Sequence, residues 1–142
     1  MKLQSSQLVT INPNHPLVMY EKPLVIALLV VDRSGSMATY GGAPLKAMHD
    51  FVVNLQNGPE PERIGIGVIS FADHTSFDIP IQLIGGVDAA GLKYSASGGT
   101  RLYGTVYDAL YALLSVATMR DRMKLETKVV LTVLTDGADT ES

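Results

Sequence analysis

The chain has 142 residues, a formal net charge of −3 at pH 7 and no cysteine. This length predicts one domain with a single core, and the lack of cysteine excludes disulfides and a thiolate zinc site. Mild acidity with scattered Lys and Arg argues against a nucleic-acid or membrane surface, and no apolar run is long enough to cross a membrane. The polar N-terminus does not resemble a signal peptide, so a cytoplasmic location is expected.

The first core element is predicted at residues 24–31, after an N-terminal extension over residues 1–23. The run 24–31 is apolar throughout, which is typical of a strand buried on both faces of a parallel sheet. Asp32, Ser34 and Ser36 follow it at alternate positions. Oxygen ligands at the carboxyl end of such a strand suit a hard divalent cation, although the same string taken alone also fits a helix N-cap.

Two further strands are predicted next. Residues 64–72 form a buried strand, and its Gly65 and Gly67 leave room for a close neighbour. Residues 77–83 alternate apolar and polar side chains, which indicates a half-exposed strand. Pro80 cannot donate to a ladder and therefore places this strand at a sheet edge. The short connection between the two strands predicts antiparallel pairing.

Helices are predicted over residues 44–56 and 102–119. The glycine-rich loop Ser97–Thr100 precedes the second helix, and Thr100 is either a further hydroxyl ligand or the N-cap of that helix. The second helix is expected to carry an apolar stripe that packs on the sheet. It also carries a second stripe of tyrosines, which is interpreted as flanking that packing. The apolar stripe is Leu102, Val106, Leu110, Leu113 and Ala117, and the tyrosines are Tyr103, Tyr107 and Tyr111.

The last predicted strand, residues 129–134, is followed by Asp136. Right-handed crossovers place this strand beside the first one and give the spatial order 3-2-1-4. The expected fold is therefore a Rossmann-like open α/β sheet, mainly parallel, with one antiparallel edge strand and helices on both faces. The order reverses between strands 1 and 4, so Asp32 and Asp136 should meet at the usual ligand-binding crevice. The fourth strand is apolar throughout, which is typical of an interior strand with a neighbour on each side. The domain over residues 24–142 is therefore expected to lack its C-terminal part, which would supply the second neighbour.

These loops resemble those of von Willebrand factor A domains with a metal-ion-dependent adhesion site. The matching residues are Asp32, Ser34, Ser36, Thr100 and Asp136. The resemblance implies Mg²⁺ or Mn²⁺ held directly by the hydroxyls, with both carboxylates acting mainly through water. It also implies a partner protein whose Glu or Asp completes the metal coordination. Within the family, the absence of cysteine and of a signal resembles bacterial intracellular members of tellurite-resistance type.

Two enzymatic or switch-like alternatives are weaker. A metal-dependent hydrolase of aspartyl-phosphatase type also places Asp after a first parallel strand, but it needs a second carboxylate where Ser34 stands. A nucleotide switch needs a G-x-x-x-x-G-K-[ST] loop, which this sequence lacks. The sequence therefore predicts a non-enzymatic, metal-dependent module for protein–protein interaction.

Overall fold

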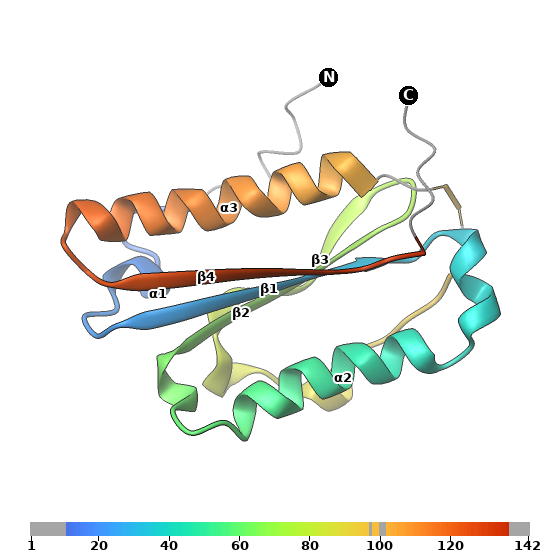
Figure 1. Ribbon diagram of the computed structural model, residues 1–142, viewed down its shortest axis with the longest axis horizontal. Coiled ribbons are helices and arrows are strands. Elements are labelled where there is room, and N and C mark those ends of the chain that lie inside the picture. Colours follow the sequence, from blue (N-terminus) through green and yellow to red (C-terminus); the bar gives the residue numbers. More distant parts are fainter. Residues whose placement is uncertain (1–10, 97, 100–101, 137–142) are drawn as a thin grey trace.

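The computed structural model describes residues 11–96, 98–99 and 102–136. A four-stranded open sheet forms the centre, with α3 along one face and α2 along the other (Figure 1). Short 3-10 turns join these elements. The main elements are α1 (Pro16–Met19), β1 (Leu24–Asp32), α2 (Ala43–Gln56), β2 (Ile64–Phe71), β3 (Thr75–Leu83), α3 (Leu102–Arg122) and β4 (Thr127–Leu134); the turns are η2 (Gly35–Tyr40), η3 (Pro61–Arg63), η4 (Ile84–Gly86) and η5 (Ala89–Gly91).

The strand order is β3-β2-β1-β4, which confirms the predicted fold class. β1 pairs in parallel with both β2 and β4, whereas β2 and β3 pair antiparallel. In this register Leu28 lies between Gly67 and Leu131. The carboxyl ends of β1 and β4 therefore reach the same edge of the sheet, beside the turn η2 (Figure 1).

β1 is buried on both faces, as its uninterrupted apolar sequence predicts. Leu28 and Val30 join the core beneath α3, and Leu29 and Val31 join the core beneath α2. Their side chains alternate because successive residues of a strand point to opposite faces. Burying both faces removes a large apolar area from water, which is the main force that stabilises the sheet.

The glycines of β2 admit close neighbours, as predicted. A Cβ atom at Gly67 would lie 2.5 Å from Cδ2 of Leu28 and 3.0 Å from Cγ1 of Ile81. A Cβ atom at Gly65 would lie 2.9 Å from Cδ2 of Leu17. Any larger residue at either position would displace a core side chain, so these glycines set how closely the neighbouring side chains pack against β2.

Arg120 joins the end of α3 to the segment that enters β1. Its side chain is fully buried, and its five N–H groups all donate to acceptors of this protein. Burial lowers its pKa, but a guanidinium remains charged at any ordinary pH. Four acceptors are backbone carbonyls, so the charge is held by main-chain dipoles. The acceptors are the carbonyls of Leu17, Tyr20, Lys22 and Glu126 and the hydroxyl of Thr127.

The exposed face of α3 differs from the prediction. The residues that α3 buries include Ala109, Ala112 and Val116, whereas Leu110 is 43% exposed. The three tyrosines expected as packing flanks are exposed, with Tyr103 at 71%. The helix turns a row of small residues toward the sheet, because alanines allow α3 to lie close to β1 and β4. The tyrosines consequently fall on the solvent side.

β4 is the outer strand and is poorly covered on both of its faces. Val129 and Val133 point to the α3 side of the sheet and Val130 to the α2 side, and each is about 40% exposed. Among the residues that the structure describes, no element fully covers either face of this strand. Such an edge favours association with other chains.

Candidate functional site

The candidate site begins at the loop that follows β1. Asp32 is fully buried, and its Oδ1 accepts a hydrogen bond of 2.7 Å from the backbone N–H of Ser34. This local bond is an Asx turn, which redirects the chain as the strand ends. Ser34 is 2% exposed, and its hydroxyl lies 3.1 Å from that of the exposed Ser36. The loop thus presents the Ser36 hydroxyl at the surface, while the Ser34 hydroxyl and the Asp32 carboxylate are buried.

The end of β4 meets this loop, as the strand order predicts. The hydroxyl of Thr135 donates to Oδ2 of Asp32 over 2.7 Å, so both carboxylate oxygens have partners within the protein. Asp136 follows and is partly exposed. Its charge contributes to the electrostatics of Tyr94, which places Asp136 at the same end of the sheet. Thr100 lies outside the described residues.

A third segment, the Tyr94 loop (residues 92–96, 98 and 99), closes over the β1 loop. The hydroxyl of Tyr94 donates to the carbonyl of Asp32 over 2.6 Å. The backbone N–H of Gly35 donates to the carbonyl of Gly98 over 3.1 Å, and that of Gly99 donates to Oδ1 of Asp73 over 2.7 Å. Three loops far apart in the sequence are therefore hydrogen-bonded to one another.

Gly98 has the backbone conformation that the glycine-rich loop predicted. Its φ of +81° lies in the left-handed region, which glycine adopts without a Cβ penalty. A Cβ atom at Gly98 would also lie 2.6 Å from Oδ2 of Asp73. The loop can therefore approach Asp73 closely only because a glycine stands there.

Tyr94, Asp73 and Arg33 were not predicted as residues of this site. Tyr94 carries no local pattern, whereas Asp73 directly follows the predicted strand 64–72 and was interpreted only as part of the turn to the next strand. Arg33 was treated as a spacer between Asp32 and Ser34. The position of Arg33 inside the motif was a further available signal, since an arginine beside a buried strand end needs a partner.

Tyr94 should ionise at higher pH than an ordinary tyrosine. Burial raises its pKa, and the negative charge of Asp32 adds to the effect. Because the folded state favours the protonated form, the Tyr94–Asp32 contact stabilises the fold at neutral pH and is lost as pH rises through the folded pKa. Absorbance titration near 295 nm should show a late component among the six tyrosines. Tyr94→Phe should remove that component, and its persistence in the variant would contradict the assignment.

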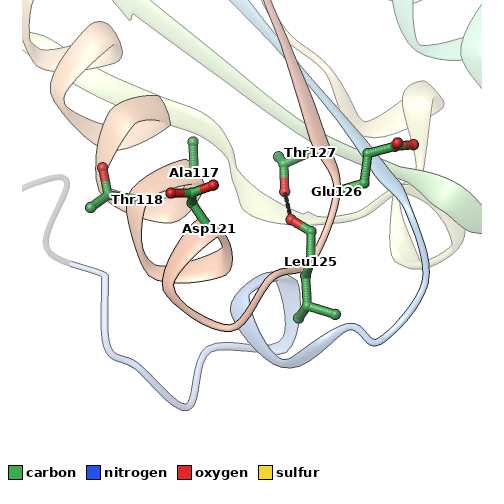
Figure 2. A pocket seen from close by; sticks show the side chains of 6 residues that line it. All are labelled: Ala117, Thr118, Asp121, Leu125, Glu126 and Thr127. Carbon is green, nitrogen blue, oxygen red and sulfur yellow. Dashed lines mark hydrogen bonds between the residues drawn. The ribbon is translucent and has the colours of Figure 1, made fainter.

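Two hollows flank the sheet at opposite ends. The one near the start of β4 has a volume of about 380 Å³, and its two carboxylates, from Asp121 and Glu126, point away from each other (Figure 2). This hollow therefore does not bring its two carboxylates together as ligands for one ion. The other, of about 280 Å³, borders Thr135 at the carboxyl end of β4. Its remaining lining is largely apolar: Met37, Tyr40, Ala43, Pro44, Ala47 and Leu134.

These features define a class of protein: an open α/β domain with a polar strand-end surface beside an apolar hollow. Among solved structures, the chain is similar to the pilus adhesin SpaC from Lactobacillus rhamnosus GG. The open conformation matches 86% of this chain at 24% identity with a TM-score of 0.64. A second structure of that adhesin matches 86% of this chain at 23% identity with a TM-score of 0.57. The match covers 16% of the adhesin chain in both cases.

No family model matches the chain, and no curated protein matches it. The similarity to the adhesin therefore rests on solved structures alone.

The comparisons correct the expected family. The structural neighbours are described as pilus adhesins, and no family model supports a von Willebrand factor A domain with a metal-ion-dependent adhesion site. The expected narrower type, an intracellular tellurite-resistance protein, is wrong for the same reason. The cytoplasmic location is contradicted too, because a pilus is a surface structure. Among the described helices, none is long and apolar enough to cross a membrane.

The expected metal-dependent function is corrected as well. Among the described residues, no three or more His, Cys, Asp or Glu side chains form a group that could hold a metal. Asp32 instead uses both oxygens in hydrogen bonds within the protein. Neither metal-dependent binding of an acidic partner nor the hydrolase alternative is supported. Binding of Mg²⁺ or Mn²⁺ itself, with Asp32, Ser34, Ser36, Thr100 and Asp136 as ligands, stays a prediction.

Two coarser expectations agree with the comparisons. Both neighbours are described as adhesins, which is consistent with a protein that is not an enzyme. The same description is consistent with interaction with other macromolecules in general.

Proposed function

We propose that this chain is a binding module of a surface adhesin and recognises an extracellular protein through the carboxyl ends of β1 and β4. The observation that carries the proposal is the similarity to a pilus adhesin over 86% of this chain. The shared fold brings three loops to one edge of the sheet, where open α/β sheets generally bind ligands.

The proposed binding surface combines polar and apolar groups. Ser36 is exposed at the tip of the β1 loop, and Tyr40 is 51% exposed at the rim of the 280 Å³ hollow. Tyrosine is enriched at protein interfaces because it buries much apolar area at little entropic cost. The surface therefore suits a partner that places an apolar side chain in the hollow and hydrogen-bonds to the adjacent hydroxyls.

A binding assay with a matched control tests this proposal. The purified chain is passed over immobilised collagen, fibronectin, fibrinogen and laminin in a surface plasmon resonance experiment. We expect saturable binding to at least one of them, and Tyr40→Ala should weaken it about tenfold or more, the loss typical of a hot-spot tyrosine. Tyr111→Ala is the control, since Tyr111 is 48% exposed on α3, away from the hollow.

Two results would count against the proposal. Absence of binding to every immobilised protein would contradict the adhesin function. Equal weakening by Tyr40→Ala and Tyr111→Ala would place the binding surface elsewhere on the molecule.

A further inference from the structure

Arg33 stands between the two oxygen-bearing residues Asp32 and Ser34, yet its side chain leaves the β1 loop. Its guanidinium Nη2 donates to Oδ1 of Asp78 on β3 over 3.1 Å, and the side chains of this pair are only 16% and 18% exposed. An ion pair shielded to this degree is screened less by salt than a surface pair. Arg33 is thus fixed in place by β3, which lies on the far side of β2 from β1.

The same guanidinium reaches the Tyr94 loop by two contacts. Nη2 donates to the carbonyl of Lys93, and the guanidinium carbon lies 5.0 Å from the centre of the Tyr94 ring. A cation at that distance from an aromatic face is attracted by the ring. Tyr94 in turn donates to the carbonyl of Asp32, immediately before Arg33 in the chain. The β1 loop therefore contacts the Tyr94 loop through Arg33, and the Tyr94 loop contacts the β1 loop in return through Tyr94.

The pairing leaves two buried polar atoms without a hydrogen-bond partner among the described residues, Nε of Arg33 and Oδ2 of Asp78. A side-on, two-bond pairing of arginine with carboxylate would satisfy both atoms. Arg33 instead directs Nη2 at both Asp78 and the Lys93 carbonyl. The geometry observed therefore gives up one ion-pair bond and gains a bond to the Tyr94 loop.

We infer that Arg33 is a positioning residue that holds the Tyr94 loop against the β1 loop and so shapes the proposed binding surface. This inference rests on the proposed function for its biological meaning, but the positioning itself does not. Asp78 fixes the direction of the guanidinium, and Tyr94 transmits the contact to Asp32. Partner binding should consequently depend on a side chain that is mostly buried beneath the surface.

Hydrogen exchange tests the positioning without any ligand. The double variant Arg33→Met/Asp78→Leu removes the ion pair without leaving a buried carboxylate uncompensated. We expect the amides of Gly35 and Gly99, which donate to Gly98 and Asp73, to exchange at least tenfold faster. Amides in the centre of β1 should be unaffected. The control is Lys46→Met/Asp50→Leu, which removes an exposed ion pair of 2.6 Å.

The outcomes separate this inference from the proposed function. Unchanged exchange at Gly35 and Gly99 in the folded double variant would overturn the positioning role, whatever the binding assay shows. Faster exchange with undiminished binding to the extracellular protein captured by the wild type would overturn the link to the binding surface. Arg33→Lys provides a further check, because it keeps the charge but loses the planar stacking group, and it should give intermediate exchange.

Discussion

Arg120→Met should destabilise the protein by about 3–5 kcal/mol, the range for breaking a buried charged network. The substitution removes five N–H donors and leaves four carbonyls and the Thr127 hydroxyl without them. Replacing a whole buried ion pair by apolar groups can be neutral, but backbone carbonyls cannot be replaced. The partly exposed acceptors will recover some hydration, whereas the Leu17 carbonyl is buried with Arg120. Urea unfolding followed by circular dichroism measures the change.

Arg122→Met is the matched control, because Arg122 is exposed two residues further along the same helix. It should change the free energy of unfolding by less than about 0.5 kcal/mol. Arg120→Lys should fall between the two, since it keeps the charge but has three donors in place of five. Equal unfolding midpoints for Arg120→Met and Arg122→Met would show that the five hydrogen bonds contribute no net stability.

Gly67→Val should cost about 1–3 kcal/mol, as overpacking of a tight core does. Its Cβ atom would lie 2.5 Å from Leu28, which is fully buried and cannot move away without disturbing α3. Valine has a higher strand propensity than glycine. The whole scale of strand propensities spans only about 1 kcal/mol, so this gain offsets only part of the cost. Thermal unfolding should show a lower midpoint with the same far-ultraviolet spectrum.

Gly85→Val tests whether the cost comes from crowding. Apart from the adjoining backbone, no atom of the described residues lies within 4 Å of a Cβ built at Gly85, so this variant should be nearly neutral. If Gly67→Val were as stable as Gly85→Val, the close approach of Leu28 to β2 would have no energetic significance.

The fold could be predicted because its strongest signals are local. The run 24–31 has no polar residue, Pro80 marks an edge strand, and right-handed crossovers leave one strand order. The exposed tyrosines of α3 could not be read correctly from spacing alone. Either the apolar stripe or the tyrosine stripe of α3 could pack on the sheet by spacing alone. In the structure the small residues Ala109 and Ala112 are buried in contact with it.

The candidate site was predicted in part. The meeting of Asp32 with the end of β4 followed from strand order, and Thr135 donates to Asp32 as a result. The contacts of Tyr94 and Asp73 join loops that are remote in sequence, so no local pattern announces them. The family inference went wrong because the same residue types also serve another purpose. A buried aspartate after a strand can satisfy the backbone and hydroxyl donors around it, as Asp32 does.

The pairing of β1 with β4 has a consequence for how the chain reaches its native state. β1 precedes β2, β3 and β4 in the chain, yet it lies inside the sheet, and its Leu24 pairs with Thr127 of β4, which follows all the other described strands. Contacts between distant residues form slowly, because a long loop must close before they stabilise anything. Until β4 has been synthesised, the apolar β1 lacks one neighbour and the sheet cannot be completed. The nascent domain therefore stays incompletely folded from the synthesis of β1 until that of β4 and should depend on chaperones during that interval.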